Sequence, residues 1–213
     1  AVMGGLPASE TRYSVNAFKK MLKAYKEINT KDLKQNLREF IKEIMPVAEE
    51  NNVKMGIHPD DPPIPLFGVP RIVSTLEDYK YILDSYNSSC NGMTFCAGSL
   101  ASNFNNDVYK IFNKFKKRVN FIHLRNIKKE KDRKSFYESN HLKGDIDFVR
   151  LIKMILKEEK TRSKIKKIEI PMRPDHGHSL LDDQSKKNFN PGYTAIGRLM
   201  GLSELRGIIK AVI

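Results

Sequence analysis

The sequence predicts an α/β protein built around a parallel sheet. From residue 53 onward, short strand patterns and amphipathic helix patterns alternate four times, which is the order of a parallel sheet with helical crossovers. The strand patterns are mostly apolar, as expected where helices cover both faces of a sheet. Metal-binding side chains occur at or near the ends of these strands, where the active sites of α/β barrels are built.

Two amphipathic helices are predicted before the strands begin. Residues 14–28 place apolar side chains on one face behind a Ser14 cap, and residues 30–50 do the same behind Thr30. Pro46 should kink or end the second helix, because proline lacks a backbone donor and its ring clashes with the preceding turn.

The βα units follow in order along the chain. Ser74 and Glu77 have capping-box spacing before the first crossover helix, and Asp145 is expected to cap a later one. The predicted strands are 53–58, 92–96, 118–124 and 165–172, and the predicted helices lie after residue 74, near 107–117, after residue 145 and within 194–211.

Composition limits the class of protein. The 213 residues are enough for one large domain or two small ones, and 40% apolar with 30% charged residues is typical of a soluble globular chain. No apolar run approaches the roughly 20 residues that span a bilayer, and the first ten residues lack the features of a signal peptide. The chain does not begin with Met, which leaves room for processing or truncation. Two cysteines form no disulfide framework and favour the cytoplasm.

The formal charge of +13 raises a nucleic-acid surface as one interpretation. The lysines, however, are spread over several helical patterns, and no aromatic residues are interleaved with them as in proteins that bind single strands. We therefore interpret them as lysines on solvated helix faces, and we expect neither a nucleic-acid nor a membrane partner.

Four residues of types that bind metals stand at equivalent places on consecutive strands. His58 and Cys96 end the first two strands, His123 lies near the end of the third, and Asp175 follows the fourth. Neighbouring parallel strands lie about 4.8 Å apart, so side chains at equal heights can converge. Two imidazoles, a thiolate and a carboxylate are good ligands for a divalent transition metal. Taken singly, each residue has a simpler interpretation, as a structural histidine, a small core residue or a turn former. The repetition on all four strands favours a metal site.

Three further residues near the fourth strand are candidates for chemistry. Arg173 could hold a carboxylate with two hydrogen bonds, and His176 could act as an acid or a base. Tyr193 could be a proton donor or a packing residue in a Pro-Gly turn.

Carboxylates and a histidine outside this group have two interpretations each. Asp60 and Asp61 could orient His58, as carboxylates support metal-bound imidazoles, or could simply form a turn among prolines. His141 could support the site, although we favour a loop residue.

Four longer motifs together resemble the D-mannonate dehydratase family: GIHPDDPPIPLFGVPRIVST, NGMTFCAGS, NFIHLRNIK and IPMRPDHGH…NPGYTAIGRLMGLSELRG. The resemblance runs from about Gly5 to the C-terminus and implies a TIM barrel, (β/α)8, of the xylose-isomerase-like kind. It implies a cytoplasmic hydro-lyase that uses Mn2+ or Fe2+ to convert D-mannonate to 2-keto-3-deoxy-D-gluconate and water in hexuronate (glucuronate) catabolism. The metal ligands it implies are His58, Cys96, His123 and Asp175, and the catalytic residues are Arg173, Asp175, His176 and Tyr193.

Proteins of that family are much longer than this chain. We therefore expect a single domain over 1–213, part of a TIM barrel, in which 1–52 are a helical lead-in and 53–213 supply about four C-terminal βα units. Such a half leaves two open sheet edges. Either a longer native protein or a partner chain would close it, and we expect a homo-oligomer, a dimer or higher.

Two other functions are compatible with the same residues. A metal-dependent sugar isomerase or epimerase on the same barrel would use the cation to polarise a carbonyl and would release no water. A nucleic-acid-binding protein would follow from the charge alone, and a truncated chain could be purely structural.

Overall fold

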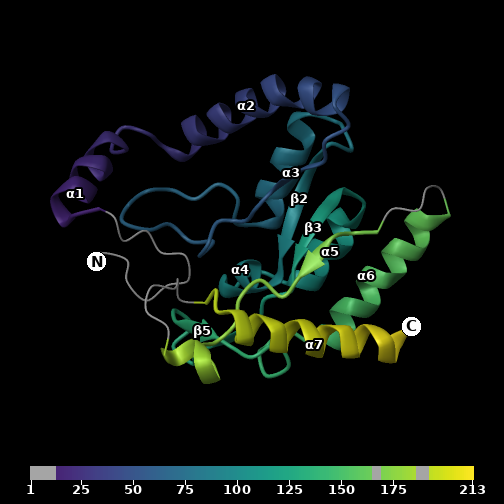
Figure 1. The fold of residues 1–213 in the computed structure, drawn as a ribbon. Coiled ribbons are helices and arrows are strands. Elements are labelled where there is room, and N and C mark those ends of the chain that lie inside the picture. The colour runs from purple at the N-terminus through teal and green to yellow at the C-terminus, as the bar shows by residue number, and fades with distance from the viewer. Residues whose placement is uncertain (1–12, 165–168, 186–191) are drawn as a thin grey trace.

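Four strands form one parallel sheet, as the sequence predicts (Figure 1). The computed structural model describes residues 13–164, 169–185 and 192–213. Within these residues the sheet runs in the order β1, β2, β3, β6, and all three neighbouring pairs are parallel. The strands are β1 (Met55–Ile57), β2 (Asn91–Cys96), β3 (Val119–His123) and β6 (Met172–Arg173). The first residues of the predicted fourth strand, 165–168, lie outside the described residues.

Apolar helix faces bury the sheet and form the core. Every residue of β2 is buried, and Phe95 on β2 packs edge-on against Phe112 with 5.2 Å between ring centroids. Tyr79 and Ile152 from other crossover helices belong to the same core cluster. The crossover helices are α3 (Leu76–Ser85), α5 (Val108–Phe115) and α6 (Phe148–Ser163). Among the described residues, no helix is both long and apolar enough to cross a membrane.

The two N-terminal helices form close to where the sequence places them. Ser14 caps α1 (Val15–Ala24), as predicted, and α1 ends before the expected residue 28. The predicted Thr30 cap of α2 (Thr30–Glu50) is wrong, because Asn29 accepts the capping hydrogen bonds. Pro46 does not end α2, since buried residues on either side of it hold the last turns against the core.

Two further caps differ from the prediction by one or two residues. The capping box of α3 consists of Thr75 and Asp78, one residue after the predicted pair. Asp147 caps α6, whereas Asp145 accepts a hydrogen bond from the backbone of Lys129. In both cases two nearby polar residues could cap the helix. The backbone conformation at the start of the helix determines which side chain lies close enough to the free N–H groups.

Two elements near the strand ends were not predicted. Helix α4 (Ala97–Ser102) follows β2 directly, and it is buried on all sides, so its sequence has no amphipathic period. An antiparallel hairpin of β4 (Ile127–Lys129) and β5 (Phe136–Glu138) occupies the region predicted to be a long loop. Each of its strands has only three residues, too few for an alternating pattern to be recognised.

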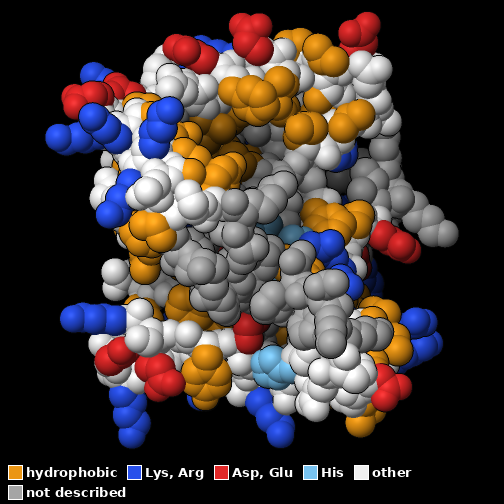
Figure 2. All heavy atoms as spheres, turned by 60° about the vertical axis from the view of Figure 1, so that its left-hand side comes forward, with side chains coloured by type: hydrophobic (Ala, Val, Ile, Leu, Met, Phe, Trp, Pro, Cys, Tyr) orange, Lys and Arg blue, Asp and Glu red, His pale blue; other side chains and the backbone are white. Residues whose placement is uncertain are grey.

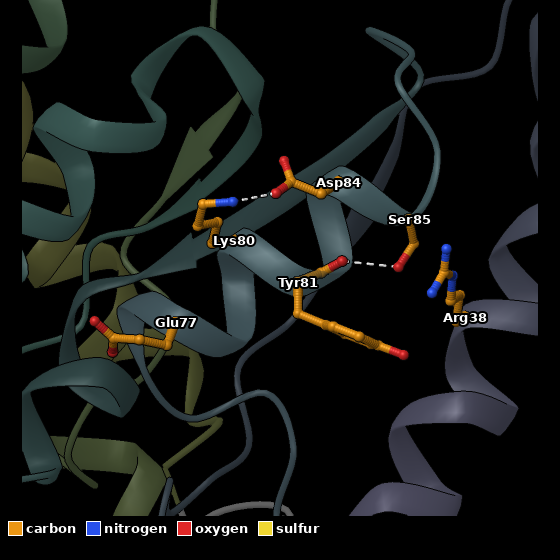
Figure 3. Close-up of a pocket in the computed structure, with 6 residues that line it drawn as sticks. All are labelled: Arg38, Glu77, Lys80, Tyr81, Asp84 and Ser85. Atoms are coloured by element: carbon orange, nitrogen blue, oxygen red, sulfur yellow. Dashed lines mark hydrogen bonds and ion pairs between the residues drawn. The ribbon is translucent and has the colours of Figure 1, made fainter.

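Helix α2 packs on α3 through polar as well as apolar contacts. Lys34 Nζ lies 2.6 Å from an Asp78 carboxylate oxygen, and the Tyr81 hydroxyl donates to the Lys34 carbonyl at 3.3 Å. A shallow pocket between the two helices exposes the Lys80–Asp84 ion pair (Figure 3). None of its lining residues is a predicted metal-binding or catalytic residue, so we assign this pocket to helix packing.

Charge on the visible face is dispersed. In the space-filling view, lysine and arginine side chains lie scattered around the periphery and alternate with acidic ones (Figure 2). This distribution on one face agrees with lysines on solvated helix surfaces.

The last helix, α7 (Ala195–Val212), lies unusually close to the loops that follow β6 and β5. A Cβ atom at Gly197 would lie 2.1 Å from the His178 carbonyl oxygen, and one at Gly201 would lie 2.2 Å from the His141 ring. The absence of side chains at these two positions therefore permits α7 to pack where it does.

We expect Gly201→Ala to weaken this packing. The same substitution at Gly207, which has nothing within 4 Å of its Cβ position, should stabilise the helix by up to about 1 kcal/mol through propensity alone. Urea unfolding should give Gly201→Ala a free energy of unfolding about 1–3 kcal/mol below that of Gly207→Ala, because overpacking displaces the buried His141 ring. Equal stability of the two variants would contradict the close contact.

Candidate metal centre

Four predicted metal ligands converge on one point. One donor atom from each of His58, Cys96, His123 and Asp175 lies within 4.8 Å of the other three. His58 Nε2 is 3.1 Å from His123 Nδ1, and His123 Nδ1 is 3.4 Å from Asp175 Oδ1. The Cys96 sulfur is 3.9 Å from Asp175 Oδ2. The structure thus brings the four residues together, and their role as ligands stays a prediction.

Strand register produces this convergence. Cys96 and His123 are the last residues of β2 and β3, and they are direct partners in the parallel ladder. His123 in turn is level with Arg173 on β6, so Asp175 follows just beyond the sheet edge. His58 comes directly after β1. The carboxyl ends of all four strands therefore lie at the same edge of the sheet, where β1 ends level with Met93, three residues before Cys96.

The donor set fits a divalent transition metal. Cys96, His123 and Asp175 are buried, and His58 is half-buried. Burial raises the pKa of the Cys96 thiol to about 12, although the positive charge of Arg125 acts to lower it. Burial also lowers the pKa of His123 to about 4. His123 is therefore neutral at pH 7, which is the ligand form of imidazole, whereas the Cys96 thiol would lose its proton on binding a cation. Two nitrogens, a thiolate and a carboxylate suit Mn2+, Fe2+ or Zn2+ better than Mg2+.

A backbone carbonyl orients His58, and this corrects one interpretation of the sequence. His58 Nδ1 lies 2.6 Å from the Pro59 carbonyl oxygen, so Nδ1–H donates there and leaves the Nε2 lone pair facing the other donors. Asp60 instead accepts from the Val73 backbone at 2.7 Å, and Asp61 pairs with Arg125 at 2.7 Å. The two carboxylates hold loops together rather than the imidazole.

The predicted acid–base residues lie beside Asp175. His176 Nε2 is 3.3 Å from the Tyr193 hydroxyl and 3.4 Å from Asp175 Oδ2. A backbone hydrogen bond of 2.8 Å from Gly177 to Gly192 and a bridge from Gly177 to Tyr193 bring the phenol to this place. Burial raises the pKa of Tyr193, and the nearby Asp175 adds to the effect.

Arg173 is the exposed member of the group. Its Nη2 donates to Asp175 Oδ1 at 2.9 Å, and its side chain is 48% exposed. Its guanidinium lies 6.0 Å from the centre of the Phe121 ring, which limits the directions it can take. The remaining N–H donors of Arg173 are thus available to a carboxylate ligand.

Sequence reasoning missed three polar residues that surround the centre. Arg125, which is 2% exposed, donates to Glu138 at 2.5 Å and to Ser99 at 3.0 Å. Glu138 also lies 3.1 Å from His176 Nδ1. Arg125 stands two residues after His123 in the NFIHLRNIK motif, and Ser99 stands three residues after Cys96 in the NGMTFCAGS motif; these positions are the signals that the sequence offers. Ser99 and Glu138 lie on the two elements that were not predicted.

His141 is more than a loop residue. It lies in a turn, but it is 3% exposed and packs between Phe148 and α7. Burial lowers its pKa to about 4, so it is neutral at pH 7. It supports the helix that borders the centre.

Comparisons with known proteins agree with the motifs. Residues 1–213 match the family model "D-mannonate dehydratase (UxuA)". The chain is 46% identical over 211 residues to a mannonate dehydratase of Chromohalobacter salexigens, covering 99% of this chain and 54% of that protein. It is also 46% identical over 215 residues to mannonate dehydratase 2 of Agrobacterium fabrum, covering 99% of this chain and 53% of that protein.

A solved structure has the same fold. The crystal structure of mannonate dehydratase from Streptococcus suis serotype 2 superposes with a TM-score of 0.83 at 34% identity, covering 99% of this chain and 56% of that one. The chain spans about half the length of the relatives it matches. With a family model that matches every residue, the chain belongs to the D-mannonate dehydratase family.

Proposed function

We propose that this chain carries the metal centre and the acid–base residues of a hydro-lyase that dehydrates D-mannonate to 2-keto-3-deoxy-D-gluconate. The observation that supports this most is the convergence of four metal-binding side chains next to the hydrogen-bonded His176–Tyr193 pair. Dehydration breaks a C–H bond next to the carboxylate and a C–O bond on the adjacent carbon. The resulting enol becomes the 2-keto product, so one proton is taken from carbon and one is given to the departing hydroxyl.

His58, Cys96, His123 and Asp175 would hold Mn2+ or Fe2+. The bound cation would supply stabilisation for the negative charge that develops on the substrate carboxylate. Arg173 would bind that carboxylate through its free N–H groups, since it is half exposed and is directed by Asp175 toward the centre.

His176 and Tyr193 would carry the two protons. They are within hydrogen-bond distance of each other, so a proton can move between them without bulk water. The raised pKa of Tyr193 keeps the phenol protonated, and a phenol can donate a proton to the departing hydroxyl. This assigns His176 the role of the base.

We further propose that the four-stranded sheet is half of a TIM barrel, (β/α)8. Its outer strands, β1 and β6, each pair on one side only within the described residues, and β1 exposes Met55. Further βα units would cover these edges, either from a longer chain or from a partner in a homo-oligomer. The described cysteines are free, which suits the cytoplasm.

Substitution of one cysteine should remove metal selectively. Protein purified without chelator should contain a divalent transition metal, and Cys96→Ser should lower its content by elemental analysis because a hard hydroxyl replaces a thiolate. Cys90→Ser alters the other buried cysteine, which lies outside the group, and should leave the metal content unchanged. Unchanged occupancy in Cys96→Ser would contradict the ligand assignment.

The proposed reaction can be tested by identifying its product and by removing the Tyr193 hydroxyl group. Metal-loaded protein incubated with D-mannonate should form a 2-keto-3-deoxy acid, and Tyr193→Phe should slow this about 10²–10⁴-fold without changing metal content. Tyr137→Phe removes an exposed hydroxyl from β5 and should leave the rate unchanged. An isomer formed without loss of water would instead identify a sugar isomerase or epimerase.

Barrel closure predicts that the other half of the barrel raises the activity of this chain. Co-expression with the portion of the Chromohalobacter salexigens protein outside the match should give a stable complex, because both free sheet edges would be paired. Size-exclusion chromatography should show co-elution, and the dehydration rate should exceed that of the chain alone. Failure of the two parts to associate would contradict the half-barrel proposal.

A further inference from the structure

We propose that Ser99 and Arg125 position the Cys96 sulfur for metal binding. In this arrangement Arg125 engages the Ser99 oxygen, and the Ser99 hydroxyl hydrogen is thereby directed at the sulfur. The inference rests on the proposed function, since it takes Cys96 as a metal ligand.

The contacts that place Ser99 are short and fully buried. Ser99 lies on α4, three residues after Cys96, and both residues are 0% exposed. Its Oγ is 3.0 Å from the Cys96 sulfur and 3.0 Å from Arg125 Nη1. Because a guanidinium can only donate hydrogen bonds, the serine oxygen must be the acceptor on the Arg125 side. The hydroxyl hydrogen is then free to point at the sulfur.

Arg125 is itself held from several directions. Its Nη1 donates to Asp61 at 2.7 Å and its Nε donates to Glu138 at 2.5 Å, so segments after β1 and within β5 both fix it. A Cβ at Gly98 would lie 2.5 Å from the Arg125 side chain, and the missing side chain lets the arginine lie against α4. A buried cation with two carboxylate partners has little freedom to turn away from Ser99.

The consequence for the metal follows from the direction of the hydrogen bond. A hydroxyl that donates to a thiolate stabilises its negative charge and fixes the sulfur in one rotamer. Groups that hydrogen-bond to metal ligands in this way typically alter metal affinity about 10–100-fold. If Ser99 only filled space in the core, it would have no such effect on affinity.

The experiment compares two serines of the same helix. Ser102 is also buried, but its hydroxyl donates to the Ser99 carbonyl oxygen at 2.7 Å and does not face the sulfur. We expect Ser99→Ala to weaken Mn2+ and Co2+ binding about 10–100-fold in chelator competition, because the thiolate loses its donor. The sulfur-to-cobalt charge-transfer band should shift in Ser99→Ala, and both quantities should be unchanged in Ser102→Ala.

A double-mutant cycle tests whether Arg125 acts through Ser99. Arg125→Lys keeps the positive charge, but a single ammonium group cannot reach Asp61, Glu138 and Ser99 together, so metal binding should weaken. If Arg125 acts through Ser99, the losses of metal affinity in Arg125→Lys and Ser99→Ala should not add in the double variant. Additive losses would overturn the role of Arg125. Equal affinities and bands for Ser99→Ala and Ser102→Ala would overturn the inference while leaving the proposed function intact. Wild-type protein that binds neither cation would overturn both.

Discussion

The parallel register of the strands is the constraint on which the rest of the site depends. All four strands run in the same direction because every neighbouring pair is parallel. The residues at their carboxyl ends therefore emerge at the same edge of the sheet. The ladder sets Cys96 beside His123 and His123 beside Arg173, and this spacing lets separated segments share one centre. A slip of one residue in β2 or β3 would turn Cys96 or His123 to the opposite face and dissolve the group. The buried core on both sides of β2 prevents that slip.

Buried charge fixes the loops that the sheet cannot fix. Arg125 joins Asp61 after β1 to Glu138 on β5, and it forms an ion pair with each of the two carboxylates. Burial lowers the pKa of an arginine, but these neighbouring carboxylates reverse that effect and raise the pKa of Arg125. The pKa of Glu138 is lowered because hydrogen bonds and charge from His176 and Arg125 outweigh its burial. Removing Arg125 would therefore leave the partly buried Glu138 carboxylate without its cation.

The sequence predicted the features that recur in every βα unit, and it missed short elements that occur once. Alternating βα patterns predicted the parallel sheet, and metal-binding residue types at or just after the ends of all four strands predicted the group at His58, Cys96, His123 and Asp175. Helix α4 and the β4–β5 hairpin were missed because the former is short and buried on every face and the strands of the latter are very short. Ser99 and Glu138 were therefore missed as well, since a residue on an unrecognised element has no predicted position. The support for His58 came from a backbone carbonyl, which no side-chain pattern can indicate.

Asp175 contacts both the candidate metal ligands and the candidate acid–base pair. Its Oδ1 faces His123 at 3.4 Å and Arg173 at 2.9 Å, whereas its Oδ2 faces His176 at 3.4 Å and the Cys96 sulfur at 3.9 Å. A cation held through one oxygen would leave the other in contact with the His176 imidazole, which lies within hydrogen-bond distance of the Tyr193 hydroxyl. Because the two oxygens belong to one planar carboxylate, a change of charge at the cation would alter the electrostatic potential at His176. In the proposed reaction, the two oxygens would link metal binding to proton transfer through this one buried side chain.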